Sequence, residues 1–302
     1  MSKIFRLVLV MLVIFAVSIL LTPVLSKLLP MFKFEQIFNR LIMIFTVAAA
    51  ALYVYRKNKR GIRQNFWKVN GFDFETPWKK LFVYGFLSGA IAVAVIIAVE
   101  VVSGPGYLRQ PLLFQDVVER FFKGMSSGIV IGIVEEFFFR GFIFGRLKEK
   151  THLFIAILLS SAFYSMTHFF DNGQIFIPDH PTTRDSLRLL FGYLEPFVNQ
   201  WGQIFPEFMG LFLFGIILCL AYLGTDSLFL AIGIHAGAVF AIKFQHSFVR
   251  KGPETMVHLF YGRLSDYDGL FEWLMLILLG SVVWFILVPH LKRSISSYKT
   301  SH

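Results

Sequence analysis

The sequence has little charge and a single cysteine. Of its 302 residues, 16% are charged and 56% are hydrophobic, whereas soluble proteins average about 25% charged residues. Because Cys219 is the only cysteine, the chain can form neither an internal disulfide nor a zinc site made of several thiolates. The shortage of charge argues against a soluble globular protein.

The sequence contains several long apolar runs. A helix of about 20 apolar residues crosses the hydrocarbon core of a bilayer. We therefore predict an all-α fold, a polytopic transmembrane bundle of about eight spans that forms a single integral membrane domain over residues 1–302. Several of the predicted spans contain charged residues or histidines. The eight runs are 7–26, 37–55, 81–99, 125–144, 153–170, 208–224, 228–242 and 271–288.

The basic residues exceed the acidic ones and give a net charge of +10. In a membrane protein, Lys and Arg in short loops set the orientation. Many of them lie in residues 56–80, so we expect this loop to be cytoplasmic and, with eight spans, both termini as well. Outside the apolar runs there is no basic face with interleaved aromatic residues, so we expect the lipid bilayer, and not a nucleic acid, as partner.

The run at 125–144 carries ionisable side chains where such groups are rare and mark function. Glu136 and Arg140 are four residues apart, so on a helix they share one face and can neutralise each other. Glu135 is rotated about 100° from Glu136 and cannot use Arg140 in the same way. We expect Glu136 to pair with Arg140 and Glu135 to face another partner.

Two histidines in later spans are the candidate partners of Glu135. His168 lies near the end of the fifth run, and His235 lies in the seventh. A lone intramembrane histidine usually makes an interhelical hydrogen bond, but two histidines and a spare glutamate on three spans favour a shared site. Such a set can activate water by acid–base chemistry or bind a divalent metal such as zinc.

These residues resemble the motifs of the CAAX-protease and bacteriocin-processing family of intramembrane proteases, which includes the type II CAAX prenyl endopeptidases and many bacterial Abi proteins. Its motifs are E-E-x-x-x-R on one transmembrane helix, F-x-x-x-H on the next, and H-x-x-x-N or H-x-x-x-D further on. The chain has the first motif intact at 135–140 and has Tyr164 in place of Phe before His168. The similarity covers about residues 125–248.

The resemblance implies an intramembrane endopeptidase that hydrolyses a peptide bond near the membrane surface, in a bacterial plasma membrane, with a peptide or protein as substrate. Glu135 matches the glutamate that activates the attacking water. His168 matches the histidine that works with it, and His235 matches the one that stabilises the oxyanion. Glu136 and Arg140 match the supporting pair. The family has been described both as metal-dependent and as glutamate-type, so a metal such as zinc, if bound, would have Glu135, His168 and His235 as ligands.

Val239 departs from the third motif, which has Asn or Asp at this position. A valine cannot donate a hydrogen bond, and losing one oxyanion donor costs on the order of 10²–10³ in rate in soluble proteases. Asp171 and Asn172 follow His168 by three and four residues and are possible substitutes on geometric grounds.

Two other functions compete with the protease. Val239 favours a catalytically weak family member that acts as a membrane scaffold or immunity protein. Buried polar groups could also form the ion path of a transporter or channel, although the sequence lacks the paired broken helices typical of inverted repeats.

Overall fold

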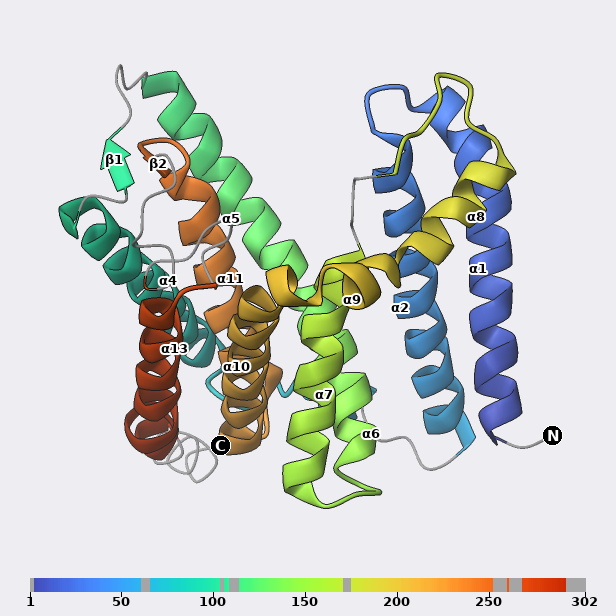
Figure 1. The fold of residues 1–302 in the computed structure, drawn as a ribbon. Helices are drawn as coiled ribbons and strands as arrows, with labels where there is room; N and C mark the ends of the chain where they lie inside the picture. The colour runs from blue at the N-terminus through green and yellow to red at the C-terminus, as the bar shows by residue number, and fades with distance from the viewer. Residues whose placement is uncertain are drawn as a thin grey trace. The chain divides into compact units, whose positions relative to one another are not determined.

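The computed structural model describes residues 3–60, 66–103, 106–108, 114–170, 175–251, 260 and 268–291. Most of this part of the chain is helical, which confirms the all-α prediction, and β1 and β2 add a short antiparallel ribbon. Along the chain the elements (Figure 1) are α1 (Lys3–Leu28), α2 (Phe34–Arg60), α3 (Phe66–Val69), α4 (Trp78–Ser103), β1 (Gly106–Leu108), α5 (Phe114–Glu136), the π-helix η1 (Phe137–Phe144), α6 (Gly145–Leu147), α7 (Leu153–Thr167), the 3₁₀-helix η2 (His168–Phe170), α8 (Thr183–Gly192), α9 (Glu195–Asn199), α10 (Trp201–Thr225), α11 (Leu228–Gln245), β2 (Val249–Lys251), α13 (Leu270–Val282) and the π-helix η3 (Val283–Leu287).

Helices long and apolar enough to cross a membrane account for seven of the eight predicted spans. They are Leu9–Leu28, Phe34–Arg56, Trp78–Ser103, Leu153–Phe170, Trp201–Thr225, Leu228–Gln245 and Leu270–Leu291. The run at 125–144 is not among them, although α5 and η1 form continuous helix through it. Glu135, Glu136 and Arg140 lie in this run, and their charges lower its apolar character.

The chain divides into two compact units, one of residues 1–63 and 166–205 and one of residues 64–165 and 206–302. In the first unit, α1 packs against α2 and α8, and Phe34, Phe38 and Leu189 are buried together. The second unit contains α4, α5, α11, α13 and most of α7 and α10. The prediction of a single domain stays a prediction.

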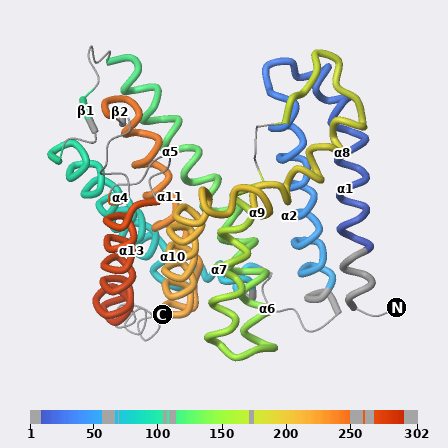
Figure 2. The backbone as a smooth tube through the Cα atoms, in the orientation of Figure 1, coloured from blue at the N-terminus to red at the C-terminus, as the bar shows by residue number. Residues whose placement is uncertain are grey.

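Glycines bring the backbones of α4 and α11 together in the second unit. A Cβ atom added at Gly89 of α4 would lie 2.2 Å from the carbonyl oxygen of Ile234, and one added at Gly237 of α11 would lie 2.1 Å from that of Phe86. Only glycine leaves room for such an approach, and small residues spaced four apart are typical of close helix pairs in membranes. Figure 2 shows α4 and α5 on either side of α11.

A second set of glycines seats α5 on α11. A Cβ atom at Gly128 would lie 2.6 Å from the carbonyl oxygen of Ala236, and one at Gly132 would lie 3.1 Å from that of Ile232. The two helices are antiparallel, because earlier residues of α5 contact later residues of α11. This packing places the C-terminal end of α5, with both glutamates, beside the middle of α11, where His235 lies.

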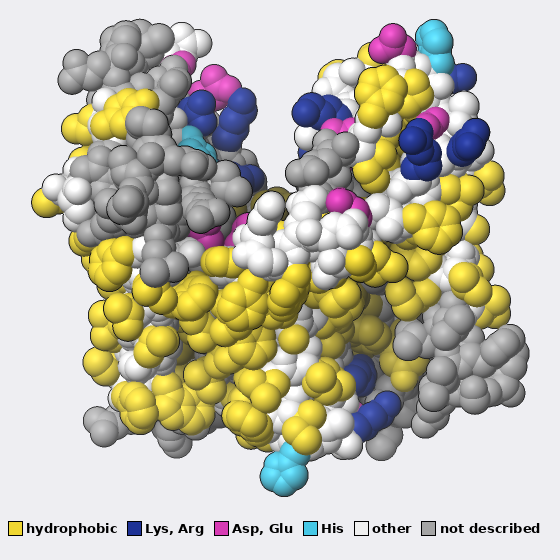
Figure 3. All heavy atoms as spheres, in the orientation of Figure 1, with side chains coloured by type: hydrophobic (Ala, Val, Ile, Leu, Met, Phe, Trp, Pro, Cys, Tyr) yellow, Lys and Arg dark blue, Asp and Glu magenta, His cyan; other side chains and the backbone are white. Residues whose placement is uncertain are grey.

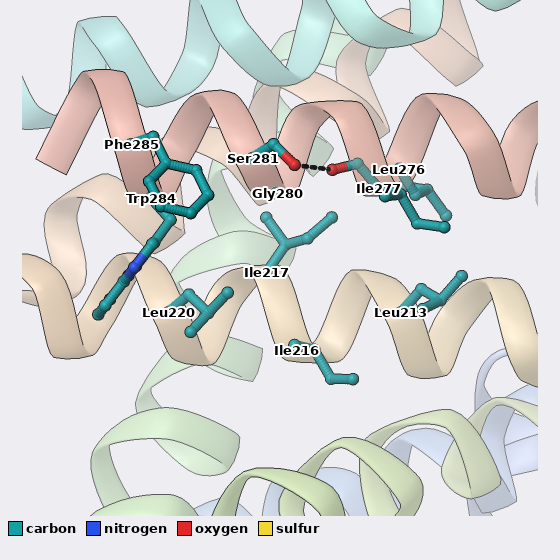
Figure 4. A pocket seen from close by; sticks show the side chains of 10 residues that line it. All are labelled: Leu213, Ile216, Ile217, Leu220, Leu276, Ile277, Gly280, Ser281, Trp284 and Phe285. Atoms are coloured by element: carbon teal, nitrogen blue, oxygen red, sulfur yellow. Dashed lines mark hydrogen bonds between the residues drawn. The ribbon is translucent and has the colours of Figure 1, made fainter. Parts of the chain in front are cut away.

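The outer surfaces of α10 and α13 are covered by hydrophobic side chains (Figure 3). A cavity of about 340 Å³ lies between these helices and is lined mainly by aliphatic and aromatic residues (Figure 4). Ser281 is the polar side chain in its lining, and its hydroxyl donates to the carbonyl oxygen of Ile277 at 2.9 Å. The cavity therefore suits hydrocarbon and offers no group for acid–base chemistry.

Candidate active site

Glu136 is the centre of a buried polar cluster. Its Oε1 atom lies 2.9 Å from Nη1 of Arg140 and 2.8 Å from Nδ1 of His235. Neither Glu136 nor Arg140 has any exposed side-chain surface, and His235 is only 3% exposed. One carboxylate oxygen therefore binds a guanidinium on its own helix and an imidazole on α11.

Arg140 has further contacts from α10 and α7. Its Nη2 atom donates to the carbonyl oxygen of Gly215 at 3.2 Å, and its guanidinium carbon lies 4.5 Å from the centre of the Tyr164 ring. Gly215 is required for this arrangement, since a Cβ atom there would lie 3.0 Å from the Cα atom of Ser161. The buried cation thus has a carboxylate, a carbonyl and an aromatic face around it, the kinds of contact that make burial of a charge tolerable.

Aromatic rings fix the position of the His235 imidazole. Tyr164 and Phe214 meet it edge to face, with ring centres 6.1 and 5.7 Å away. Because Nδ1 is held by Glu136, the other ring nitrogen, Nε2, is the one that remains for a ligand. A histidine held at one nitrogen by a carboxylate has its tautomer and orientation set, as in other catalytic sites.

Glu135 lies on the open side of this cluster. Its Oε2 atom is 3.8 Å from Nε2 of His235, and its side chain is 23% exposed. That distance is too long for a direct hydrogen bond but suits two groups that share one water molecule. Among the described residues, the buried Oε2 atoms of Glu135 and Glu136 have no hydrogen-bond partner, and buried polar atoms normally have one. Each of these two oxygens can accept a hydrogen bond from a further polar group.

The π-helix η1 begins directly after Glu136 and contains Arg140. Single π turns within α-helices are rare and occur often at functional sites. Ser160 of α7 donates to the carbonyl oxygen of Phe139, at 3.4 Å, and so satisfies part of the rearranged backbone. Nothing in the sequence pattern indicates this π turn.

The structure brings together Glu135, Glu136, Arg140 and His235 of the predicted site. The expected ion pair of Glu136 and Arg140 is present. The sequence did not show that Glu136 would also be the nearest acid to His235, nor that Tyr164 would contact both His235 and Arg140. Tyr164 occupies the first position of the second motif, and this position was the sequence signal that it belongs to the site.

His168 opens η2 at the end of α7 and belongs to the first unit. Its role beside Glu135 stays a prediction. Asp171 and Asn172 lie outside the described residues. Val239 is half-buried on α11, one turn after His235, and its side chain adds no hydrogen-bond donor there.

The side chains of the cluster include few that are free to bind a metal ion. Glu135 and His235 supply two candidate ligands within the second unit, while Oε1 of Glu136 is already bound by Arg140. Within the part of the chain that the structure describes, no group of three or more His, Cys, Asp or Glu residues is arranged to hold a metal ion. Chemistry at this cluster therefore rests on its side chains.

The fold and the cluster define a polytopic membrane protein with a Glu, Arg and His centre buried among its helices. Residues 118–241 match the family described as type II CAAX prenyl endopeptidase Rce1-like. This match confirms the resemblance to the CAAX-protease family and contains Glu135, Glu136, Arg140, His168 and His235. No curated protein and no solved structure matches the chain.

Proposed function

We propose that this protein is an intramembrane endopeptidase that hydrolyses a peptide bond near the membrane surface. The observation that carries the proposal is the position of the His235 imidazole between two glutamates. Glu136 binds its Nδ1 atom, and Oε2 of Glu135 lies 3.8 Å from its Nε2 atom. A fixed imidazole facing a second, partly exposed carboxylate is an arrangement suited to acid–base chemistry on water.

In the proposed reaction, Glu135 is the general base. Its carboxylate takes a proton from water as the water oxygen attacks the peptide carbonyl carbon. The resulting tetrahedral intermediate carries its negative charge on the former carbonyl oxygen. Glu135 then gives the proton to the peptide nitrogen as the C–N bond breaks, so that an acid and an amine leave.

His235 stabilises the oxyanion in this scheme. In the proposed scheme its Nδ1–H donates to Glu136. When both ring nitrogens carry a proton, Nε2–H is free to donate a hydrogen bond to the oxyanion. Donors fixed before the reaction are the main source of rate enhancement in acyl transfer.

His168 is proposed as the partner of Glu135, on the strength of the second motif. It follows Tyr164 by four residues, and Tyr164 contacts His235. The finer assignments made from the sequence, namely a bacterial plasma membrane and both termini in the cytoplasm, are also part of this proposal. If a metal takes part, Glu135, His168 and His235 are its proposed ligands.

A second function, a weakly active scaffold or immunity protein, is favoured by Val239. The side chain one turn after His235 has no donor, so the oxyanion site as described has only His235. A scaffold would keep the buried ion pair for packing and would not need Glu135.

The proposal is tested with the purified full chain in liposomes and a mixture of membrane-associated peptides, with cleavage products identified by mass spectrometry. We expect wild-type protein to give defined products and Glu135→Gln to give none. Glu149→Gln, which changes an exposed glutamate in the turn after α6, is the matched control and should remain active. Equal product formation by wild type and Glu135→Gln would refute the proposed role of Glu135. A chelator added to wild type tests the metal, whose removal would stop cleavage only if it takes part.

A further inference from the structure

A polar cavity of about 410 Å³ lies between α5 and α11, outside the catalytic cluster. It is lined by Arg120, Lys123, Ser126 and Ser127 near the start of α5 and by Lys243 and His246 near the end of α11. Basic side chains gather at this end of α5 in Figure 3. The proposed reaction uses none of these residues.

The charge lining the cavity is only partly neutralised. Lys123 forms a salt bridge with Glu119, one turn earlier on α5. In the described part of the chain, no salt bridge involves Arg120 or Lys243, and both side chains are half-buried. The hydroxyl of Ser127 donates to the carbonyl oxygen of Lys123 at 2.6 Å. The attraction for an anion therefore comes mainly from Arg120 and Lys243, which have no salt bridge among the described residues.

The cavity lies where both helices reach the edge of their apolar stretch. The candidate span on α11 ends at Gln245, and the apolar run of α5 starts at Met125. Because the helices are antiparallel, Arg120 and Lys243 come to the same end of the pair. Basic pockets between membrane helices bind the head groups of anionic lipids on the cytoplasmic side of membranes, and the same attraction of cations for phosphate applies to this cavity at the other surface.

Two phenylalanines follow Arg120 on α5, next in sequence to residues that line the cavity. Phe121 is 38% exposed and Phe122 is 66% exposed, while the Phe121 ring also packs edge to face on Phe240 of α11, with centres 5.4 Å apart. A free phosphate ion would gain nothing from contact with this apolar surface. A phospholipid would place its phosphate between the cations and its acyl chains along the phenylalanines.

The cavity is separate from the catalytic cluster. Eight residues separate Lys243 from His235 on α11, and eight separate Ser127 from Glu135 on α5. At 1.5 Å per residue, each separation is about 12 Å. A molecule in the cavity would contact the same two helices as the cluster without touching Glu135 or Glu136.

We propose that this cavity binds the phosphate group of an anionic phospholipid through Arg120 and Lys243, and so fastens α5 to α11. The proposal goes beyond the peptidase function and does not depend on it. Each cation near a membrane surface contributes about 1 kcal/mol to binding an anionic lipid, so losing one should weaken binding roughly fivefold.

The test uses the purified full chain with phosphatidylglycerol, phosphatidylcholine or sodium phosphate, and measures bound lipid by native mass spectrometry together with the thermal unfolding midpoint. We expect phosphatidylglycerol to be retained and to raise the midpoint more than the other two additions. Arg120→Gln and Lys243→Gln should each lower phosphatidylglycerol retention roughly fivefold. Lys80→Gln, at the exposed start of α4, removes one charge at another span end and should change nothing.

Three results would overturn the proposal. One is equal phosphatidylglycerol retention by Lys243→Gln, Arg120→Gln and Lys80→Gln. Another is stabilisation by sodium phosphate as large as that by phosphatidylglycerol, which would assign the cavity to a free anion. The third is a raised KM for a peptide substrate in Lys243→Gln with lipid retention unchanged, which would assign the cavity to an acidic part of the substrate. Each variant is first compared with wild type in phosphatidylcholine alone, to show that it is folded.

Discussion

Glu136 and His235, which are 99 residues apart in the sequence, are joined by a contact of 2.8 Å between Oε1 and Nδ1. The same oxygen holds Arg140. Glu136 is therefore a positioning residue for the imidazole as well as the counterion of a buried arginine, and Glu135 is the glutamate left to act on a ligand.

The buried ion pair should be necessary for stability. Arg140→Ala leaves Glu136 charged and buried without its guanidinium, and removal of one partner of a buried pair costs about 3–5 kcal/mol. Arg188→Ala is the control, because the Arg188 side chain is 60% exposed where it pairs with Asp185 at 3.7 Å. Loss of an ion pair whose cation is exposed to solvent costs about 0–1 kcal/mol. Thermal unfolding in detergent measures both, and equal losses would contradict the account of Arg140.

The glycine contact between α4 and α11 gives a second stability prediction. In Gly89→Ala the new methyl group meets the carbonyl oxygen of Ile234 at 2.2 Å, so the helices must separate, at a cost of about 1–3 kcal/mol typical of overpacking. Gly202→Ala in α10 is the control, since nothing lies within 4 Å of its added Cβ and alanine favours helix by up to about 1 kcal/mol. A Gly89→Ala protein as stable as Gly202→Ala would show that the backbones are not in contact.

Val239 is expected to limit the rate of cleavage. Val239→Asn places an amide one turn after His235 and should raise kcat, by less than the factor of about 10²–10³ ascribed to a well-placed oxyanion donor, because the surroundings are not shaped to orient it. Val239→Leu is the control without a donor. A kcat that is unchanged in Val239→Asn would mean that another group supplies the donor or that no oxyanion forms at this site.

The start of α8 should weaken in acid. The backbone N–H of Thr182 donates to Asp185 Oδ2 at 2.8 Å, and this hydrogen bond is the main cause that lowers the pKa of the Asp185 carboxyl. A lowered pKa stabilises the folded form fully above the ordinary value of about 3.9, and this contribution is lost as the pH falls through the folded value. The unfolding midpoint of wild type should therefore fall more than that of Asp185→Asn between pH 6 and pH 3. If the unfolding midpoints of wild type and Asp185→Asn fell equally over this pH range, the role given to the Asp185 carboxylate would be wrong.

Local features of the site could be predicted from the sequence, but its assembly could not. The pairing of Glu136 with Arg140 follows from a spacing of four residues on one helix. The contact of Glu136 with His235 depends instead on how closely α5 approaches α11. The sequence signal for that approach is the row of glycines at 124, 128 and 132, which face α11. The π turn that follows Glu136 has no sequence signal.

The assignment of Glu135 as the base is the central claim, and the measurement that tests it most directly is complementation in cells that depend on this protein. The Glu135 side chain makes no hydrogen bond through its buried Oε2 among the described residues, so Glu135→Gln should be produced in normal amounts, with an unfolding midpoint close to that of wild type. It should nevertheless fail to restore function, because an amide cannot accept the proton of the attacking water. Full complementation by Glu135→Gln at wild-type protein levels would contradict the peptidase account and support a scaffold.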